Sequence, residues 1–528
     1  MMKALYGSAG KIIAVGLGLS LMASTALATP LKIESENIVF YGDVDPELAK
    51  KTVRDWEVYR RMIFALSGID RPDADREKLT VYGFYDTADL QDFIGDKNGR
   101  TAGVYTNGPE GPIFLTSVNR KYTDDGFSEQ VGLHEYTHHV MHALVTDGFP
   151  RWYDEGFANY LSTMQISDDV ISVGAPTAAH LRAIESGFAE WISPETVLGA
   201  IDRYPSMSIK ERLRGGMTSF YAQSWLYVHY LRSDPRFKGT LGAYVRELDT
   251  PGLDPLVAFE NAHGISPQQF HEEAVKYYKT NQFPVDQYQP KPVFMDVDMK
   301  GSRISEAELA HAQLPAYLAF LNKYNKRQMG RALADAQKEF GGDPMIYSAY
   351  AALDIEGENY DDAVARTEGA LSANPTDARL IRAAGMTRLA RVTRPAAEDA
   401  GRYDAYTYET TDDATLGIQH LEKVLTKNRE DFYSIATLVD FYGKSDAIPT
   451  STVMGAVDVL ESKYMDSVNS EWGMDLANIY AKAKKMESAC DYAEQVRSLN
   501  RGRKKRQTGN SPARLEAFDA AYGSYCNV

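Results

Sequence analysis

Cysteine is almost absent from the chain, which has only 2 in 528 residues. So few thiols exclude a disulfide-dense scaffold and any metal site built from four cysteines. Basic charge is also in deficit, because 57 Lys and Arg residues face 73 Asp and Glu residues, for a formal net charge of −16. This balance disfavours a broad electrostatic footprint for nucleic acid, so we expect no nucleic-acid partner.

Long hydrophobic runs are missing, and even the N-terminal run is short. Ile12–Met22 is apolar, and Ala26-Leu27-Ala28 has the small-x-small pattern of a signal-peptidase site. These features predict a signal peptide over residues 1–28, cleavage near Ala28, and export to the periplasm or the extracellular space. The alternative is an N-terminal membrane anchor, but the run is too short to span a bilayer comfortably. No later stretch reaches about 18 apolar residues, so we expect no integral membrane segment after signal removal.

The first part of the mature chain combines strand and helix patterns. Strands are predicted over Asn37–Tyr41, Leu79–Tyr85, Gly103–Thr106 and Ile113–Ser117. We expect the last two strands to be joined by a turn around Asn107-Gly108. Asp45-Pro46 is expected to open a long helix that ends at Gly68, and the pattern is mostly helical from Glu129 onward.

A change of pattern marks the start of the second half of the chain. Residues 283–300 contain three prolines and no helical period, which favours a domain boundary. We therefore predict an α+β domain over 29–285, a linker over 286–302 and an all-α domain over 303–528.

One stretch of the all-α region matches a tetratricopeptide-like helix-turn-helix repeat of about 34 residues. With Pro375 as its closing proline, Ala363 and Ala370 occupy the two small positions where paired helices touch, and Gly357–Tyr360 forms the turn. Further helices of this kind are expected over Gln419–Asn428 and Leu476–Ser498, with an irregular insertion over Thr393–Asp413. The alternative is an unrelated helical bundle, because a single repeat is well matched.

Histidine is clustered, since 4 of the 10 histidines lie between His134 and His142. His134-Glu135-Tyr136-Thr137-His138 is an HExxH sequence, and on a helix residues four apart share one face. Both imidazoles can therefore reach one ion, and two neutral imidazoles suit zinc. Glu135 is placed to hold the metal-bound water rather than the metal. The alternative is a helix whose histidines pack or face solvent.

A catalytic zinc needs a third protein ligand and one open position. The metzincin pattern fails, because Met141 and Leu144 stand where it requires glycine and histidine. The segment Trp152–Tyr160 has the sequence pattern WxxEGxAxY. It follows residues 147–150, Asp-Gly-Phe-Pro, which should end the preceding helix. A helix starting near Arg151 would return antiparallel and could aim Glu155 at the two histidines.

These two motifs together resemble the gluzincins, and more narrowly the peptidase MA-like families. The resemblance covers roughly Asn37–Tyr278 and implies that His134, His138 and Glu155 bind one zinc ion, with Glu135 as general base. It implies hydrolysis of a peptide or protein substrate by an α+β domain made of a small sheet, the HExxH helix and a helical subdomain. A GAMEN-type exopeptidase motif is absent, so removal of N-terminal residues is not implied.

Several further residues are candidates for supporting roles. Tyr221 begins a YxQS segment that resembles the gluzincin helix carrying an oxyanion donor, although packing is an equal alternative. Asp154 or Asn159 could orient a ligand histidine, and a solvated helix face is an equal alternative for both. His139 and His142 extend the histidine cluster, but outer-sphere or surface roles are expected for both.

The binding surfaces expected from the sequence are less specific. Residues 107–117 are expected to form either an ordinary hairpin or an edge strand that pairs with an extended peptide. The helical region is expected to bind a protein partner or to brace the catalytic domain. Cys490 and Cys526 are expected to form a disulfide in an exported protein, and the alternative is two buried free cysteines. The main rival to the peptidase interpretation is a non-catalytic scaffold that holds zinc for structure only, and a second rival is a zinc hydrolase that acts on another kind of bond.

Overall fold

The computed structural model describes residues 29–67, 78–97, 101, 103–118, 127–142, 150–186, 191–199, 216–248, 250, 252–395, 406–461, 472–501 and 512–526. The predicted signal peptide, residues 1–28, lies outside the described residues, as does Gly68 at the predicted end of the first helix. Within these described ranges, no helix is both long and apolar enough to cross a membrane.

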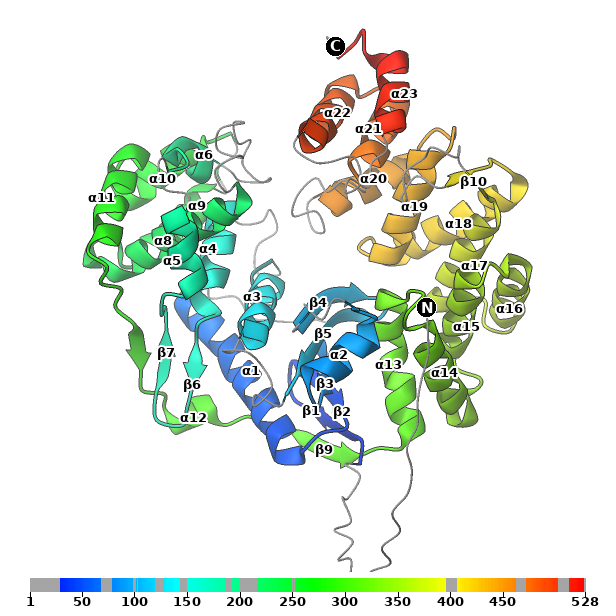
Figure 1. Cartoon of the computed structure of the whole chain (residues 1–528), viewed down its shortest axis with the longest axis horizontal. Helices are drawn as coiled ribbons and strands as arrows, with labels where there is room; N and C mark the ends of the chain where they lie inside the picture. Colours follow the sequence, from blue (N-terminus) through cyan, green and yellow to red (C-terminus); the bar gives the residue numbers. More distant parts are fainter. Residues whose placement is uncertain are drawn as a thin grey trace, which may run out of the picture.

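A six-stranded sheet forms the base of the molecule (Figure 1). Its strands are β1 (Leu31–Glu34), β2 (Ile38–Gly42), β3 (Leu79–Phe84), β4 (Gly103–Gly108), β5 (Gly111–Ser117) and β9 (Lys300–Arg303), in the order β4-β5-β3-β2-β1-β9. The pairs β2–β3 and β3–β5 are parallel, and the other three pairs are antiparallel. The four predicted strands are confirmed as β2 to β5, and β4 lies at one edge of the sheet.

The turn between β4 and β5 differs from the prediction by two residues. Gly108 pairs with Gly111, so the connecting residues are Pro109 and Glu110 rather than Asn107-Gly108. Gly111 takes the positive φ value of 112° that this tight connection requires, a conformation that glycine adopts without strain. The hairpin is therefore longer than expected, and its tip reaches farther from the sheet.

Helices cover both faces of this sheet. Val81 and Phe114 point into the core shared with α1 (Pro46–Ser67) and α3 (Phe127–His142). Tyr82 and Leu115, one residue farther along each strand, point into the core shared with α13 (Glu306–Phe320) and α14 (Lys326–Phe340). Burial on both faces explains why β5 reads as a continuous apolar run. The shorter α2 (Thr87–Ile94) packs on the α13 side.

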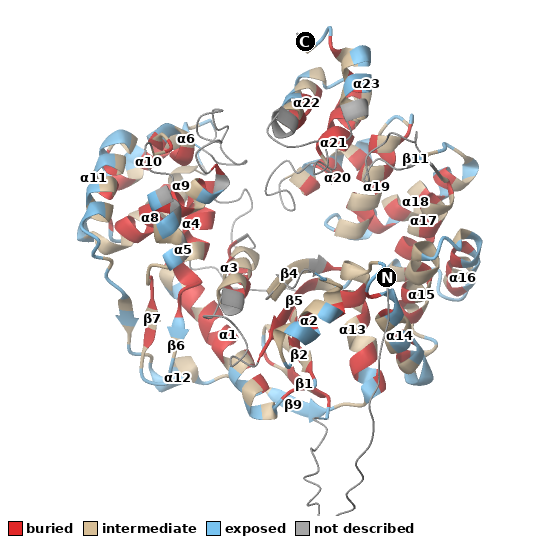
Figure 2. Cartoon of the chain, in the orientation of Figure 1, coloured by how far each residue is buried: buried red, intermediate tan, exposed pale blue. Residues whose placement is uncertain are grey.

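A helical subdomain follows α3 along the chain (Figure 1). Its helices are α4 (Arg151–Leu161), α5 (Ala178–Ser186), α6 (Pro194–Leu198), α8 (Met217–Ser233), α9 (Thr240–Leu248), α10 (Pro255–His263) and α11 (Pro267–Lys279), with a 3-10 turn η2 at Pro235–Phe237. A small antiparallel sheet adjoins them, formed by β6 (Gln165–Ile166), β7 (Ile171–Val173) and β8 (Asp286–Tyr288). Figure 2 shows that buried residues concentrate along α1, α4 and α8, which pack around one core.

The segment predicted as a linker, residues 286–302, contributes to both sheets. Its first part, β8, pairs with β7, and its last part includes most of β9, which pairs with β1. The short helix α12 (Pro292–Met295) lies between these strands. All four residues of β9 are exposed, so backbone pairing holds this strand without an apolar pattern in the sequence.

The rest of the chain is a helical array that curves away from the sheet (Figure 1). Its helices after α14 are α15 (Pro344–Glu356), α16 (Tyr360–Ala373), α17 (Ala378–Arg391), α18 (Asp412–Lys427), α19 (Phe432–Lys444), α20 (Ser451–Val459), α21 (Gly473–Lys482), α22 (Met486–Arg501) and α23 (Pro512–Tyr522). An α+β region followed by a helical region is thus confirmed at the level of architecture.

The predicted repeat corresponds to α15 and α16. Ala363 and Ala370 are both buried, as small residues at a helix contact should be. Within the insertion predicted over Thr393–Asp413, β10 (Thr393–Pro395) and β11 (Tyr406–Tyr408) pair as a two-stranded antiparallel sheet.

Cys490 and Cys526 form a disulfide that ties the end of the chain to α22. The two residues are separated by 36 positions, and a loop of this size implies about 4 kcal/mol of stabilisation in the chain-entropy model. We expect Cys526→Ser to lower the melting temperature of the helical region while leaving the metal content unchanged. Thermal unfolding of the variant and of reduced wild type checks this, and equal melting temperatures in all samples would contradict it.

Candidate metal centre

The helix α3 is held in a fixed orientation by packing on two sides. The ring centroids of Tyr136 and Trp56, which belongs to α1, lie 5.1 Å apart. Toward the sheet, a Cβ at Gly132 would lie 2.2 Å from the Phe114 ring, so any larger residue there would have to displace this buried ring. The HExxH sequence is therefore carried on a rigid helix between α1 and β5.

The second motif lies on α4, which begins at Arg151 as predicted. Its glycine, Gly156, faces α8, where an added Cβ would lie 2.4 Å from the carbonyl oxygen of Ser224. The preceding Glu155 is buried. The close contact of α4 with α8 thus explains the glycine of the motif and fixes the helix that carries Glu155.

The structure brings His134, His138 and Glu155 together. The two Nε2 atoms are 3.1 Å apart, and Glu155 Oε2 lies 3.3 Å from His134 Nε2 and 3.6 Å from His138 Nε2. All three ligand atoms lie within 4.8 Å of one another. Glu155 lies 17 and 21 positions after the two histidines in sequence and on a different helix, so two helices converge on one point.

This spacing fits a tetrahedral zinc ion. Ligand atoms at about 2.0–2.1 Å from a tetrahedral centre lie about 3.3 Å from one another. The three observed separations of 3.1, 3.3 and 3.6 Å agree with that value. A tetrahedral ion held by these two imidazoles and one carboxylate would have a fourth position for water, as catalytic zinc sites do.

Buried negative charge surrounds the site. Burial opposes protonation of His138, but the neighbouring Asp154 and Glu155 carboxylates raise its pKa well above the ordinary value. Burial likewise opposes ionisation of Glu155, but the adjacent imidazoles of His138 and His134 hold its pKa below the ordinary value. The pocket therefore stabilises positive charge, which is the property a cation site requires.

Asp154 occupies the orienting position that was predicted for it or for Asn159. Its Oδ1 lies 2.9 Å from His138 Nδ1, and its other oxygen is 3.6 Å from an Arg151 guanidinium nitrogen. A proton on Nδ1 leaves Nε2 free to coordinate metal. Asn159 instead donates to the backbone carbonyl of Glu155 at 2.8 Å.

Glu135 lies on α3 between the two histidines and is half-buried. Its carboxylate forms no hydrogen bond or ion pair with any residue that the structure describes. Half-buried carboxylates usually have a partner. Because Glu135 has none among the described residues, its carboxylate is available to a water molecule or a substrate.

Tyr221 lies in the second turn of α8 and is partly buried, with its ring near that of Phe220. The helix packs across α4, the helix that carries Glu155. Its role as an oxyanion donor stays a prediction.

The sequence reading missed His180, on α5. Its Nε2 lies 3.1 Å from Asn159 Oδ1, and its ring stacks on Trp225 with centroids 5.1 Å apart. Burial, with a further contribution from nearby His134, lowers the pKa of His180 to about 4. Its buried Nδ1 has no hydrogen-bond partner among the described residues. A neutral imidazole therefore stands beside the site, and only the packing of α5 on α8 brings it there.

Three further histidines were considered from the sequence, two in the cluster and His271 on α11. The Nδ1 atom of His139 is 2.9 Å from the hydroxyl of Tyr105, which links α3 to strand β4. The side chain of His142 lies outside the described residues. His271 packs in the subdomain, with its Nδ1 2.7 Å from Tyr227 Oη.

Comparison with protein-family models and with curated proteins finds no match to this chain. Any conclusion about function therefore rests on the residues and geometry described above.

Three buried histidines predict a loss of stability in acid. Burial lowers the pKa of His180, His229 and His263 to about 4 each. In the unfolded chain these histidines bind protons below about pH 6.5, whereas in the folded chain they stay neutral down to about pH 4. The free energy of unfolding is therefore highest at neutral pH and falls as the pH drops toward 4. Each histidine contributes up to about 3 kcal/mol to this loss.

Urea unfolding between pH 7 and pH 4 measures this effect. His263→Gln, which lies far along the chain from the metal-binding motifs, should reduce the slope of stability against pH. If the free energy of unfolding of His263→Gln depends on pH as steeply as that of wild type, the proposed contribution of buried His263 is wrong.

Proposed function

We propose that this chain is an exported zinc-dependent peptidase of the gluzincin type. The observation that carries the proposal is the convergence of His134, His138 and Glu155 at spacings that suit zinc, beside the unpaired carboxylate of Glu135. When bound there, zinc lowers the pKa of its water toward about 7 and polarises the substrate carbonyl.

The residues of the chain then perform the remaining steps. Glu135 accepts a proton from the attacking water and delivers it to the leaving amine. Asp154 holds the Nδ1 proton of His138, so the ring keeps one orientation through the reaction. Tyr221 or the neutral His180 donates to the developing oxyanion.

The position of the sheet supports a peptide substrate. Strand β4 is an edge strand, and its Tyr105 contacts His139 on the HExxH helix. An extended peptide can add to such an edge through backbone hydrogen bonds, which suits substrates of varied sequence. This arrangement favours an unfolded or extended segment over a small molecule.

The second candidate function is a scaffold that uses zinc for structure only. The helical array, with its stacked helix pairs, favours a binding role of this kind. The unpaired Glu135 argues for catalysis, because a structural zinc site has no use for a base.

A digest of a diverse peptide library by purified, zinc-loaded wild type separates the two. Cleavage products that disappear after chelation support the peptidase. Full zinc occupancy with no cleavage of any library member supports the scaffold.

Replacement of Tyr221 by Phe tests the oxyanion donor. We expect zinc content to stay at wild type and kcat to fall by about 10²–10³, the range typical of one lost donor. His180→Phe is the matched comparison on α5. A kcat within two-fold of wild type for Tyr221→Phe, with a large loss for His180→Phe, would move the role to His180.

A further inference from the structure

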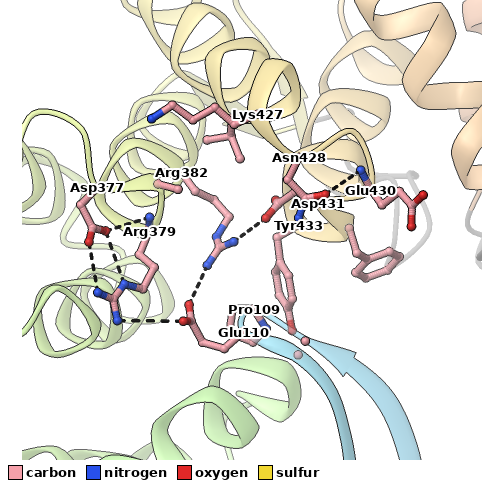
Figure 3. A pocket seen from close by; sticks show the side chains of 15 residues that line it. Pro109, Glu110, Asp377, Arg379, Arg382, Lys427, Asn428, Glu430, Asp431 and Tyr433 are labelled. Atoms are coloured by element: carbon pink, nitrogen blue, oxygen red, sulfur yellow. Dashed lines mark hydrogen bonds and ion pairs between the residues drawn. The ribbon is translucent and has the colours of Figure 1, made fainter. Parts of the chain in front are cut away.

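A cavity of about 360 Å³ lies where the β4–β5 turn meets the helical array (Figure 3). Residues 108–111 of the turn form one wall, the first turn of α17 forms a second, and residues 424–433 of α18 and α19 form a third. We call this space the junction cavity. Its volume falls in the range of about 300–1,000 Å³ that is usual for ligand sites.

Two arginines of α17 fix the hairpin tip at the edge of this cavity. Glu110 lies 3.5 Å from a guanidinium nitrogen of Arg382 and 3.9 Å from one of Arg379. Arg382 is itself buried and pairs with Asp431, the residue that caps the start of α19 (Figure 3). The turn is therefore tied to two helices of the array, and the walls of the cavity are held in place.

The edge strand leads from the metal centre to the junction cavity. Tyr105 contacts His139, the residue after the ligand His138, and Gly108 lines the cavity three residues farther along β4. At about 3.3 Å per residue, a peptide paired with β4 covers this distance, about 10 Å, in three residues. A substrate held at the metal centre would thus pass its flanking segment into the cavity.

The chemistry of the lining suits a polypeptide. Acidic and basic side chains occur there in nearly equal number, and Arg379 and Arg382 are already paired with carboxylates. Such a lining does not select a strongly charged ligand, but it offers hydrogen bonds to backbone and polar groups. The phenol ring of Tyr433 adds an aromatic wall.

A smaller apolar pocket of about 90 Å³ opens beside the junction cavity. The two spaces share Pro109, Arg379, Arg382 and Tyr433 in their linings. Beyond these residues the smaller pocket is mostly apolar, with contributions from α13, α15 and α17. Its size suits one aliphatic side chain.

We propose that the junction cavity binds the flanking segment of an extended polypeptide substrate, with one aliphatic side chain in the adjacent pocket. This inference rests on the proposed function, because it takes β4 as the strand that aligns the substrate. It makes the helical array a recognition site for long chains and predicts that short peptides do not use it.

Equilibrium binding tests the cavity without turnover. Zinc-loaded, full-length Glu135→Gln is titrated against fluorescein-labelled casein, an unfolded polypeptide, and against a labelled casein hexapeptide, with anisotropy as the readout. Ala378→Trp and Lys427→Trp, each in that background, fill the cavity from opposite walls. Both residues are exposed, and neither contributes to a buried core. Ala373→Trp, at an exposed position of α16 outside the lining, is the matched control.

We expect casein to bind at least ten-fold more weakly to both cavity variants and unchanged to the control, with hexapeptide binding the same in all four proteins. Casein affinity equal in all variants, or no casein binding by the parent protein, would overturn the inference. Wild type that cleaves no peptide, while casein binding still depends on the cavity, would refute the peptidase and leave the cavity assignment standing.

Discussion

Glu135→Gln should keep zinc in the protein and remove nearly all peptidase activity. Glutamine preserves the shape of the side chain, and in the proposed site the metal would be held by His134, His138 and Glu155, so metal content and melting temperature should stay near wild type. Hydrolysis should fall by about 10²–10⁴, the usual contribution of a general base. Zinc analysis and the rate on a cleaved library peptide measure both effects on one sample.

The control for this substitution is Glu195→Gln, on helix α6 of the same subdomain. It should leave both zinc and rate unchanged. Equal, measurable activity in wild type and Glu135→Gln would show that another group removes the proton from water.

Glu155→Ala should instead empty the metal site. In the proposed site the carboxylate is one of three ligand groups, and it is buried beside both histidines, so its removal would leave two donors. We expect zinc affinity to fall by several orders of magnitude and activity to be lost with it. His134→Ala and His138→Ala should behave the same way, since each removes one of the three donors.

Glu185→Ala, an exposed position on α5, is the control for nonspecific loss of charge. Competition with a chelator of known affinity measures zinc binding in each protein. Full zinc retention in Glu155→Ala, at wild-type affinity, would contradict the ligand assignment.

Local sequence signals were sufficient to place the site. The HExxH spacing puts two histidines on one face of α3. The helix-ending residues 147–150, followed by the second motif, put Glu155 on the next helix. Both helices begin close to the predicted residues, because helix periodicity and the motif spacing are properties of short segments.

Features that depend on distant packing were not predictable in the same way. His180 reaches the site only because α5 packs on α8, and no spacing relative to the HExxH motif marks it. Strand β9 is polar and fully exposed, so its pairing with β1 leaves no apolar pattern to read. The junction cavity likewise depends on Glu110 meeting Arg379 and Arg382, more than 260 positions away.

Titration of the metal-free protein with zinc, followed by the rate of peptide hydrolysis, tests the central claim most directly. A site with one set of three ligands predicts that activity rises in proportion to added zinc and reaches its plateau at about one equivalent per chain. Full activity before any zinc is added, or no hydrolysis of a diverse library at one bound equivalent, would contradict the account.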